Sequence, residues 1–262
     1  MKAIILAAGM GTRLGQYTKN LPKGRLKFMG KSLIERQVDT LRSAGVEDIV
    51  IVKGYMPDEI QIPNVKYYLN EDYANTNMVE TLFAAEEQMN DEMLVCYSDI
   101  IYESSVVEKA MSAKVDIGVV ADKDYLSYWQ ARLDDWQNDI ESFVIDDDGG
   151  IVDLGNKKCE MSEAQTRIVG IVKYSRKGAE ILKKVYHENK RRYFDKDEPW
   201  LRSKSFKKAY TTCILQAIID HGYRVDPVLI SGGWMEFDTV EDYERALSWV
   251  EDGSVGKFIN LS

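Results

Sequence analysis

Histidine and cysteine are scarce in this sequence, and their scarcity excludes several kinds of site. The 262 residues include only two histidines, His187 and His221, so no HExxH motif exists and a zinc site would need other ligands. The three cysteines, Cys96, Cys159 and Cys213, form no CxxC pair and are odd in number. We expect them to be small apolar fillers in a protein of a reducing, cytoplasmic compartment.

The sequence also lacks long hydrophobic runs. No run approaches the ~20 apolar residues of a membrane helix, and the apolar run at 3–8 is too short for the apolar region of a signal peptide. The net charge of −9 argues against a surface that coats nucleic acid or anionic membranes.

Acidic residues are absent from the first 34 positions, and the first carboxylate of the chain is Glu35. The basic residues of that segment are Lys2, Arg13, Lys19, Lys23, Arg25, Lys27 and Lys31. A basic segment on an acidic chain predicts a focused anion site.

Apolar runs alternate with helical spacings along the first half, which predicts an α/β fold with a mostly parallel sheet. Buried strands are predicted at 2–7, 48–52, 65–69, 93–97 and 115–121, and helices at 32–42, 77–89 and 105–111. After residue 121 we expect a small β-rich elaboration, with a hairpin at 142–145 and 151–154 about a DDDGG turn. The remaining predicted elements are strands at 167–174 and 224–229 and helices at 177–187, 209–220 and 240–250.

A glycine-rich turn directly follows the first predicted strand. The string LAAGMGTRL runs from Leu6 to Leu14, and Leu21-Pro22-Lys23 comes shortly after it. Such a turn lets backbone N–H groups approach phosphates closely, and Arg13 and Lys23 add cations beside it. It is neither GxGxxG, because position 14 is leucine, nor a P-loop, because no Gly-Lys-Ser/Thr follows.

The string LAAGxGTRL…PK resembles the nucleotidyltransferase family that joins an NTP to a phosphorylated sugar or small alcohol. Asn70-Glu71-Asp72-Tyr73 with Asn75-Thr76-Asn77 is similar to a stretch of the cytidylyltransferases acting on choline phosphate and phosphonates. The resemblance implies a Rossmann-like nucleotidyltransferase fold, in one domain over 1–262 with a nucleotide-binding half at 1–121 and an acceptor-binding half at 122–262. It implies catalytic roles for Arg13 and Lys23. Nucleotide contacts are implied for Leu6, Ala8, Gly9, Gly11, Thr12, Asn77 and Ser98.

Two further strings resemble the metal motifs of the same family. Ser98-Asp99 ends a predicted strand, and Trp234-Met235-Glu236-Phe237-Asp238-Thr239 is similar to W-x-E-x-D. The resemblance implies that Asp99, Glu236 and Asp238 hold Mg²⁺. Alternation puts Glu236 and Asp238 on one face of an extended segment, where both can reach one ion.

The acceptor is less well defined by the sequence. Residues 122–141 resemble the W-x-x-R…D-x-E segment of small-molecule cytidylyltransferases, in which the aromatic at Trp129 faces a quaternary ammonium in choline-phosphate enzymes. Arg132 and Arg167 instead favour an anionic acceptor. Core or lid packing remains open for Trp129, and a surface position for Arg132. Gly24-Arg25 departs from the small apolar pair of many relatives, and Arg25 is expected either to contact phosphate or to face solvent.

We therefore predict a Mg²⁺-dependent cytidylyltransferase that transfers CMP from CTP to a small phosphonate or phosphorylated alcohol and releases pyrophosphate. An acceptor that is already an anion needs no general base, so charge neutralisation and alignment supply the catalysis. One alternative is a sugar-1-phosphate nucleotidylyltransferase using UTP, CTP or dTTP. Another is a non-catalytic nucleotide-sensing subunit, against which Arg13, Lys23, Asp99 and Asp238 argue together. The polar, mostly basic segment 190–208 is expected to be a solvated loop, a lid or a contact in a homodimer rather than a nucleic-acid site.

Overall fold

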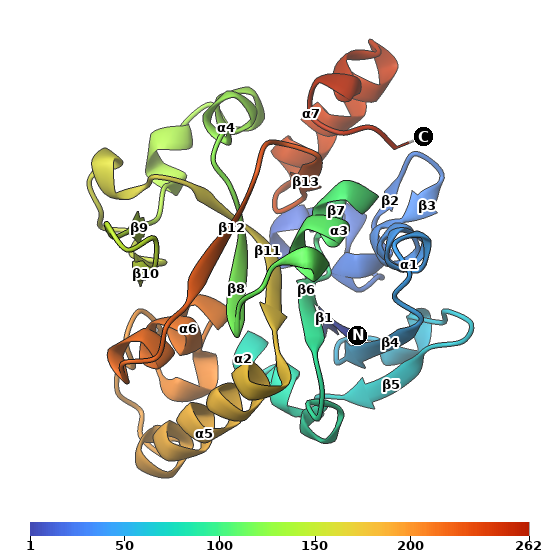
Figure 1. The fold of residues 1–262 in the computed structure, drawn as a ribbon. Coiled ribbons are helices and arrows are strands. Elements are labelled where there is room, and N and C mark those ends of the chain that lie inside the picture. Colours follow the sequence, from blue (N-terminus) through green and yellow to red (C-terminus); the bar gives the residue numbers. More distant parts are fainter. Residues whose placement is uncertain (262) are drawn as a thin grey trace.

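A single large sheet organises the part of the chain that the computed structural model describes, residues 1–261 (Figure 1). Its strand order is β12-β8-β11-β6-β1-β4-β5. The strands are β1 (Lys2–Ala7), β4 (Asp48–Lys53), β5 (Lys66–Leu69), β6 (Met93–Tyr97), β8 (Ile117–Asp122), β11 (Arg167–Tyr174) and β12 (Asp226–Ile230). Only β11 runs antiparallel to its neighbours, β6 and β8. The predicted mostly parallel mixed sheet is confirmed.

Helices pack on both faces of this sheet. They are α1 (Leu33–Ser43), α2 (Met78–Phe83), α3 (Ser104–Ser112), α4 (Leu126–Arg132), α5 (Arg176–Tyr193), α6 (Thr211–Asp220) and α7 (Val240–Glu251). One apolar core contains residues of α1, α3, α4 and α7, and the other contains residues of α2, α5 and α6. The arrangement is therefore a three-layer α/β/α fold.

Strand β1 shows why the sheet lies between two cores. Its side chains alternate, so that Ile5 belongs to one core and Ile4 to the other, and both are fully buried. Burying such a side chain contributes about 1.5–3 kcal/mol. A strand that is apolar on both faces fits only the middle of a covered sheet.

Short strand pairs complete the fold at its edges. They are β2 (Lys27–Phe28) with β3 (Lys31–Ser32), β7 (Ile100–Tyr102) with β13 (Trp234–Glu236), and β9 (Phe143–Ile145) with β10 (Ile151–Leu154). The last pair is the predicted hairpin, closed by the bond from the Asp146 N–H to the Gly150 carbonyl at 2.9 Å. The β7–β13 pair is antiparallel and brings the end of the chain beside the residues that follow β6.

Three expectations differ from the structure. The helix expected at 77–89 ends at Phe83, and a 3-10 turn at Glu86–Gln88 then carries Met89 into the core. No helix was predicted in segment 122–141, which resembles the cytidylyltransferases, but this segment contains α4. The predicted loop 190–208 is helical at its start, because α5 continues to Tyr193.

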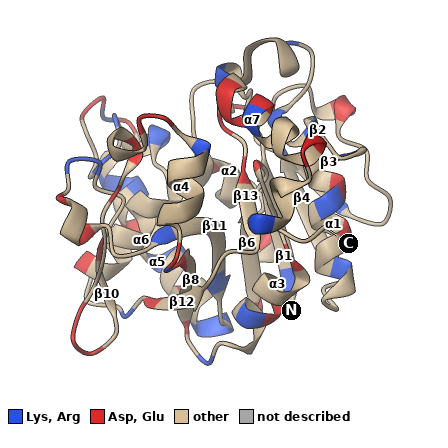
Figure 2. Cartoon of the chain, turned by 90° about the horizontal axis from the view of Figure 1, so that it is seen from above, with Lys and Arg blue, Asp and Glu red and all other residues tan. Residues whose placement is uncertain are grey.

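Charged residues of both signs are spread along the elements drawn in Figure 2, and neither colour is confined to one part of that view. No helix within residues 1–261 is long and apolar enough to cross a bilayer.

Candidate active site

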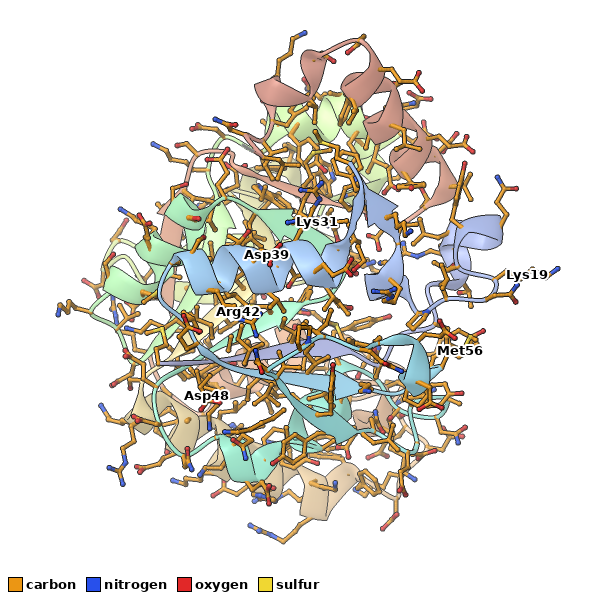
Figure 3. All side chains as sticks on the ribbon, turned by 90° about the vertical axis from the view of Figure 1, so that its right-hand side faces the viewer. Lys19, Lys31, Asp39, Arg42, Asp48 and Met56 are labelled. Carbon is orange, nitrogen blue, oxygen red and sulfur yellow. The ribbon has the colours of Figure 1, made fainter. Side chains whose placement is uncertain are left out.

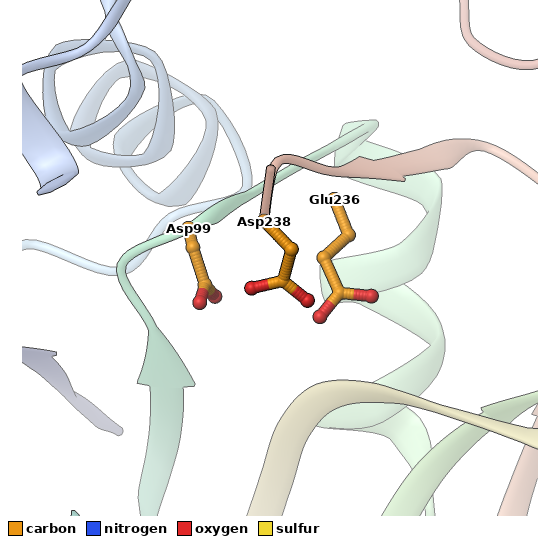
Figure 4. Close-up of side chains that lie close together, drawn as sticks. All are labelled: Asp99, Glu236 and Asp238. Atoms are coloured by element: carbon orange, nitrogen blue, oxygen red, sulfur yellow. The ribbon is translucent and has the colours of Figure 1, made fainter. Parts of the chain in front are cut away.

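Three carboxylates from distant parts of the chain meet at one end of the sheet (Figure 4). Asp99 follows β6, Glu236 ends β13, and Asp238 lies two residues further on. One carboxylate oxygen of each lies within 4.8 Å of the others. The Phe237 N–H donates to the Asp99 carbonyl at 2.9 Å and fixes the two segments side by side. The predicted juxtaposition of Glu236 and Asp238 with Asp99 is confirmed.

The ammonium of Lys23 lies between two of these carboxylates. Its Nζ is 2.6 Å from Asp99 Oδ2 and 2.6 Å from Asp238 Oδ1. Burial alone would lower the pKa of Lys23, but the charges of Asp99 and Asp238 raise it above its ordinary value. Lys23 therefore stays a cation throughout the physiological range.

Two glycines, one in the glycine-rich loop and one beside Lys23, allow close packing around Lys23. Gly11 has a φ of 67°, and a Cβ there would lie 3.0 Å from the Cβ of Lys23. At Gly24 a Cβ would lie 2.4 Å from Cδ1 of Ile34. The departure from the family pattern at Gly24 therefore has a steric cause in this chain, because Ile34 of α1 packs directly against Gly24.

Arg132 holds the carboxylates from the side opposite Lys23. Its side chain is 2% exposed, and its NH1 lies 2.8 Å from Glu236 Oε2. Its NH2 lies 2.6 Å from Asp242 Oδ2 and 3.4 Å from Asp238 Oδ2. Asp242 is fully buried, caps the start of α7, and accepts the N–H of Asp238 at 3.0 Å. A surface position for Arg132 is therefore wrong, and in this structure it contacts the cluster rather than a cavity.

Asp238 and Glu236 differ in their ionisation behaviour. Burial would raise the pKa of Asp238, but the charges of Lys23, Arg132 and Arg13 lower it overall. Burial raises the pKa of Glu236, and the neighbouring charge of Asp238 raises it further. Negative charge on Glu236 is thus disfavoured beside Asp238, a condition that a divalent cation would relieve.

A cavity lies on the loop side of the cluster. Its lining includes every residue expected to contact the nucleotide: Leu6, Ala8, Gly9, Gly11, Thr12, Asn77 and Ser98. Arg13, Lys23, Asp99 and Asp238 complete its charged lining. The structure thus brings these predicted residues together, and we call this space the loop cavity.

A second cavity, of about 680 Å³, opens on the other side of the cluster. We call it the distal cavity. Its lining comes mostly from 139–141, 155–158, 167–170 and 199–212. It shares Arg13, Met78, Tyr97, Asp99 and Asp238 with the loop cavity. Two of the three carboxylates, Asp99 and Asp238, are therefore part of a wall common to both cavities, while Glu236 lines the distal cavity but not the loop cavity.

Trp129 lines neither cavity. Its side chain is 0% exposed, and the guanidinium groups of Arg132 and Arg167 lie 4.5 Å and 4.1 Å from its ring centroid. The expectation that its face meets a ligand ammonium is wrong for this arrangement, because two protein cations already cover the ring, and the packing alternative holds. Arg167 does line the distal cavity, 3.3 Å from Glu141.

The basic segment 1–34 is not one continuous anion site. Among its basic residues, Arg13 and Lys23 line the loop cavity. Arg25 instead pairs with Glu35 at 3.4 Å and lines neither cavity. Figure 3 shows Lys19 projecting away from the body of the molecule and Lys31 near Asp39, with which it pairs at 2.7 Å.

The profile of the MobA-like NTP transferase domain matches residues 3–149, which hold the glycine-rich loop, Lys23 and Asp99. The chain belongs to this family. The prediction of a nucleotidyltransferase is confirmed.

One relative covers nearly the whole length of this MobA-like NTP transferase. It is 32% identical over 257 residues to the CTP:phosphoglutamine cytidylyltransferase of Campylobacter jejuni, with 93% of this chain and 98% of that protein aligned. It is 27% identical to the 2-aminoethylphosphonate cytidylyltransferase of Lancefieldella rimae, over 71% of this chain and 72% of that protein. The CTP:phosphocholine cytidylyltransferase of Streptococcus pneumoniae has the same fold, with a TM-score of 0.70 at 22% identity over 95% of this chain and 98% of that one.

Several residues of the site had no role in the sequence prediction. Tyr97 lines both cavities and Asp242 anchors Arg132. The distal cavity of this MobA-like NTP transferase also contains a group of basic side chains, Lys157, Lys158, Arg202 and Lys204. The basic composition of 190–208 was the one signal that could have pointed to two of them.

Proposed function

We propose that this MobA-like NTP transferase is a Mg²⁺-dependent cytidylyltransferase that transfers CMP from CTP to a small acceptor bearing a phosphate or phosphonate. The observation that carries the proposal is the wall common to the two cavities. A donor in the loop cavity and an acceptor in the distal cavity would meet at Asp99, Asp238 and Arg13. In this division residues 1–121 supply most of the nucleotide site and residues 122–262 most of the acceptor site.

The relatives support the choice of nucleotide and the size of the acceptor. The Campylobacter jejuni and Lancefieldella rimae proteins are named as cytidylyltransferases acting on phosphoglutamine and 2-aminoethylphosphonate. Both acceptors are small and carry a phosphoryl or phosphonyl group. We propose the same class of acceptor for this chain.

The transfer is an in-line displacement at the α-phosphorus of CTP. An oxygen of the acceptor's phosphate or phosphonate forms a bond to that phosphorus, and the bond to the oxygen bridging the β-phosphorus breaks. The electron pair leaves with pyrophosphate. Because the attacking oxygen is already an anion, no side chain has to remove a proton. Neither His187 nor His221 lines a cavity, in keeping with this chemistry.

The residues of the cluster fit Mg²⁺, which prefers oxygen ligands. They offer three carboxylates, and Oδ1 of Asp99 is buried without a hydrogen-bond partner. A bound ion would neutralise charge between the α-phosphate and the acceptor oxygen. Lys23 contacts the same carboxylates here, so we propose that its ammonium turns to the CTP phosphates when Asp99 and Asp238 bind the ion. Arg132 keeps Glu236 and Asp238 in place throughout.

A pyrophosphate-release assay tests the proposal. The panel pairs CTP, UTP, ATP and dTTP with phosphoglutamine, 2-aminoethylphosphonate, choline phosphate and glucose 1-phosphate, with Mg²⁺ or with EDTA. We expect release with CTP and a small acceptor, loss of release with EDTA, and recovery when Mg²⁺ is restored. Release with glucose 1-phosphate alone would identify a sugar-phosphate enzyme instead. No release with any pair would leave the non-catalytic reading as the better one.

A further inference from the structure

Basic side chains dominate the part of the distal cavity that lies away from the carboxylate cluster. Lys157, Lys158, Arg202 and Lys204 line this part, while Arg167 lines the cavity within electrostatic reach of Glu236 in the cluster. The acidic side chains that line the cavity outside the cluster are Asp139 and Glu141, and both lie near Arg167, at 3.6 Å and 3.3 Å. This part of the wall therefore carries an excess of positive charge.

Much of that charge has no partner in the protein. Lys157, Lys158 and Lys204 form no ion pair with any other residue of 1–261. Arg202 pairs with Asp153 through one nitrogen, while its buried NH1 has no hydrogen-bond partner. The side chain of Arg167 is only 9% exposed, and its buried Nε likewise has no hydrogen-bond partner. Lys157, Lys158 and Lys204 are exposed to solvent, whereas the buried donors of Arg202 and Arg167 would be satisfied by a ligand that supplies acceptor atoms.

A cationic acceptor would find little to bind here. The one aromatic ring proposed for a quaternary ammonium, Trp129, is covered on its faces by Arg132 and Arg167. Choline phosphate would place its trimethylammonium among lysines and arginines, and like charges repel. A carboxylate in the same place would meet cations that form short, charge-assisted hydrogen bonds.

We propose that the acceptor carries a carboxylate in addition to the phosphate or phosphonate that attacks CTP, and that Lys157, Lys158, Arg202 and Lys204 select it. The proposal rests on the cytidylyltransferase function proposed above. In this proposal the attacking phosphate or phosphonate of the acceptor lies at the end of the distal cavity formed by the carboxylate cluster. The carboxylate of the acceptor lies at the end formed by the basic side chains. The acceptor class is thus a phosphorylated or phosphonylated amino or carboxylic acid.

Matched acceptors that differ by a single carboxylate test this directly. Phosphoserine without its carboxylate is phosphoethanolamine, and 2-amino-4-phosphonobutanoate without its carboxylate is 3-aminopropylphosphonate. Phosphoglutamine and choline phosphate complete the set. We measure kcat/KM for each with CTP and Mg²⁺. The expected result is at least a ~10-fold preference for the carboxylate-bearing member of a pair, since one charge-assisted contact changes affinity by roughly that factor.

Variants of the basic wall then connect the preference to these residues. Lys158→Gln and Arg202→Gln should each lower the preference ratio about tenfold. Arg191→Gln is the matched control, because Arg191 is exposed at the end of α5 and lines neither cavity. The ratio is the readout, because general damage to folding or turnover lowers both members of a pair alike.

The outcomes separate this inference from the proposed function. Turnover of choline phosphate or the decarboxylated members as fast as their partners would overturn the carboxylate site and leave the cytidylyltransferase standing. An equal loss for all acceptors in Lys158→Gln and Arg202→Gln would also overturn it, and would assign these cations to phosphate groups. If no acceptor is used with CTP at all, both proposals fail.

Discussion

The loop cavity and the distal cavity differ in how the chain builds them. The loop cavity comes mainly from three short stretches, 6–23, 73–81 and 97–99, and the glycine-rich turn contributes Gly9, Gly11 and Thr12 to its lining. The distal cavity draws mostly on segments scattered between 139 and 238, and charged side chains make up about half of its lining residues. A backbone-built site needs particular residues at fixed spacing, whereas a side-chain-built site can be assembled from many positions.

The two cavities also differ in how their cations are partnered. In the loop cavity, Arg13 and Lys23 both contact Asp238, at 2.8 Å and 2.6 Å. In the distal cavity, three lysines have no ion pair within residues 1–261. Substitutions on the shared wall should therefore lower kcat/KM equally for every acceptor. Substitutions of the basic residues in the distal cavity should lower it more for some acceptors than for others.

The largest effect is expected on the shared wall. Asp238→Asn and Lys23→Met should each lower kcat/KM by about 10²–10³-fold for all acceptors, because each removes a charge at the reacting centre. Asp39→Asn is the control, since Asp39 is an exposed acid that pairs with Lys31 outside the site. Steady-state kinetics on two acceptors would check this, and near wild-type rates in both variants would mean that the reaction centre lies elsewhere.

The support behind the wall should matter for stability as well as for metal binding. Arg132→Met leaves Asp242 and its neighbours without their buried counter-charge, and should lower the free energy of unfolding by about 3–5 kcal/mol. Urea denaturation measures this, and isothermal titration with Mg²⁺ in the folded protein measures the loss of metal affinity. In the double variant Arg132→Met, Asp242→Leu part of the stability should return. A double variant no more stable than Arg132→Met would contradict the buried-pair account.

A smaller effect on kcat/KM is expected for the basic residues of the N-terminal segment, and it should differ between those inside and outside the loop cavity. Arg13→Gln should lower kcat/KM for CTP by only about tenfold, because the Arg13 side chain is 66% exposed and its charge is screened by solvent. Arg25→Gln, its counterpart outside the cavities, should change kcat/KM less than twofold. Equal losses in the two variants would show that the whole basic segment, rather than the loop cavity, attracts the nucleotide.

The smallest effect concerns the packing under the glycine-rich loop. Gly24→Ala forces a methyl group against Ile34 and should lower the free energy of unfolding by about 1–3 kcal/mol. Gly256→Ala is the matched control, because a Cβ there meets nothing within 4 Å. Thermal or urea unfolding of the pair provides the measurement. A stable Gly24→Ala protein would mean that α1 and the loop adjust to each other.

The sequence allowed the sheet and the loop cavity to be predicted because both depend on local pattern. Strand β11 was predicted with its observed ends, and α1 starts after Ser32 with the expected cap. The environment of Trp129 was not predictable, because two arginines distant from each other in sequence cover its ring. Nor could the sequence reveal that Arg132 meets Asp242 across 110 positions, a contact that only the tertiary fold creates.

The wall common to the two cavities is tested most directly by the binding of the transfer product. The CDP conjugate of the best acceptor should span both cavities, so CTP and the free acceptor should each displace it. At ten times its own Kd, either competitor should weaken product binding about elevenfold, which calorimetry in the presence of Mg²⁺ can measure. Displacement by CTP alone, with product affinity unchanged by saturating acceptor, would contradict a single reaction centre between the loop cavity and the distal cavity.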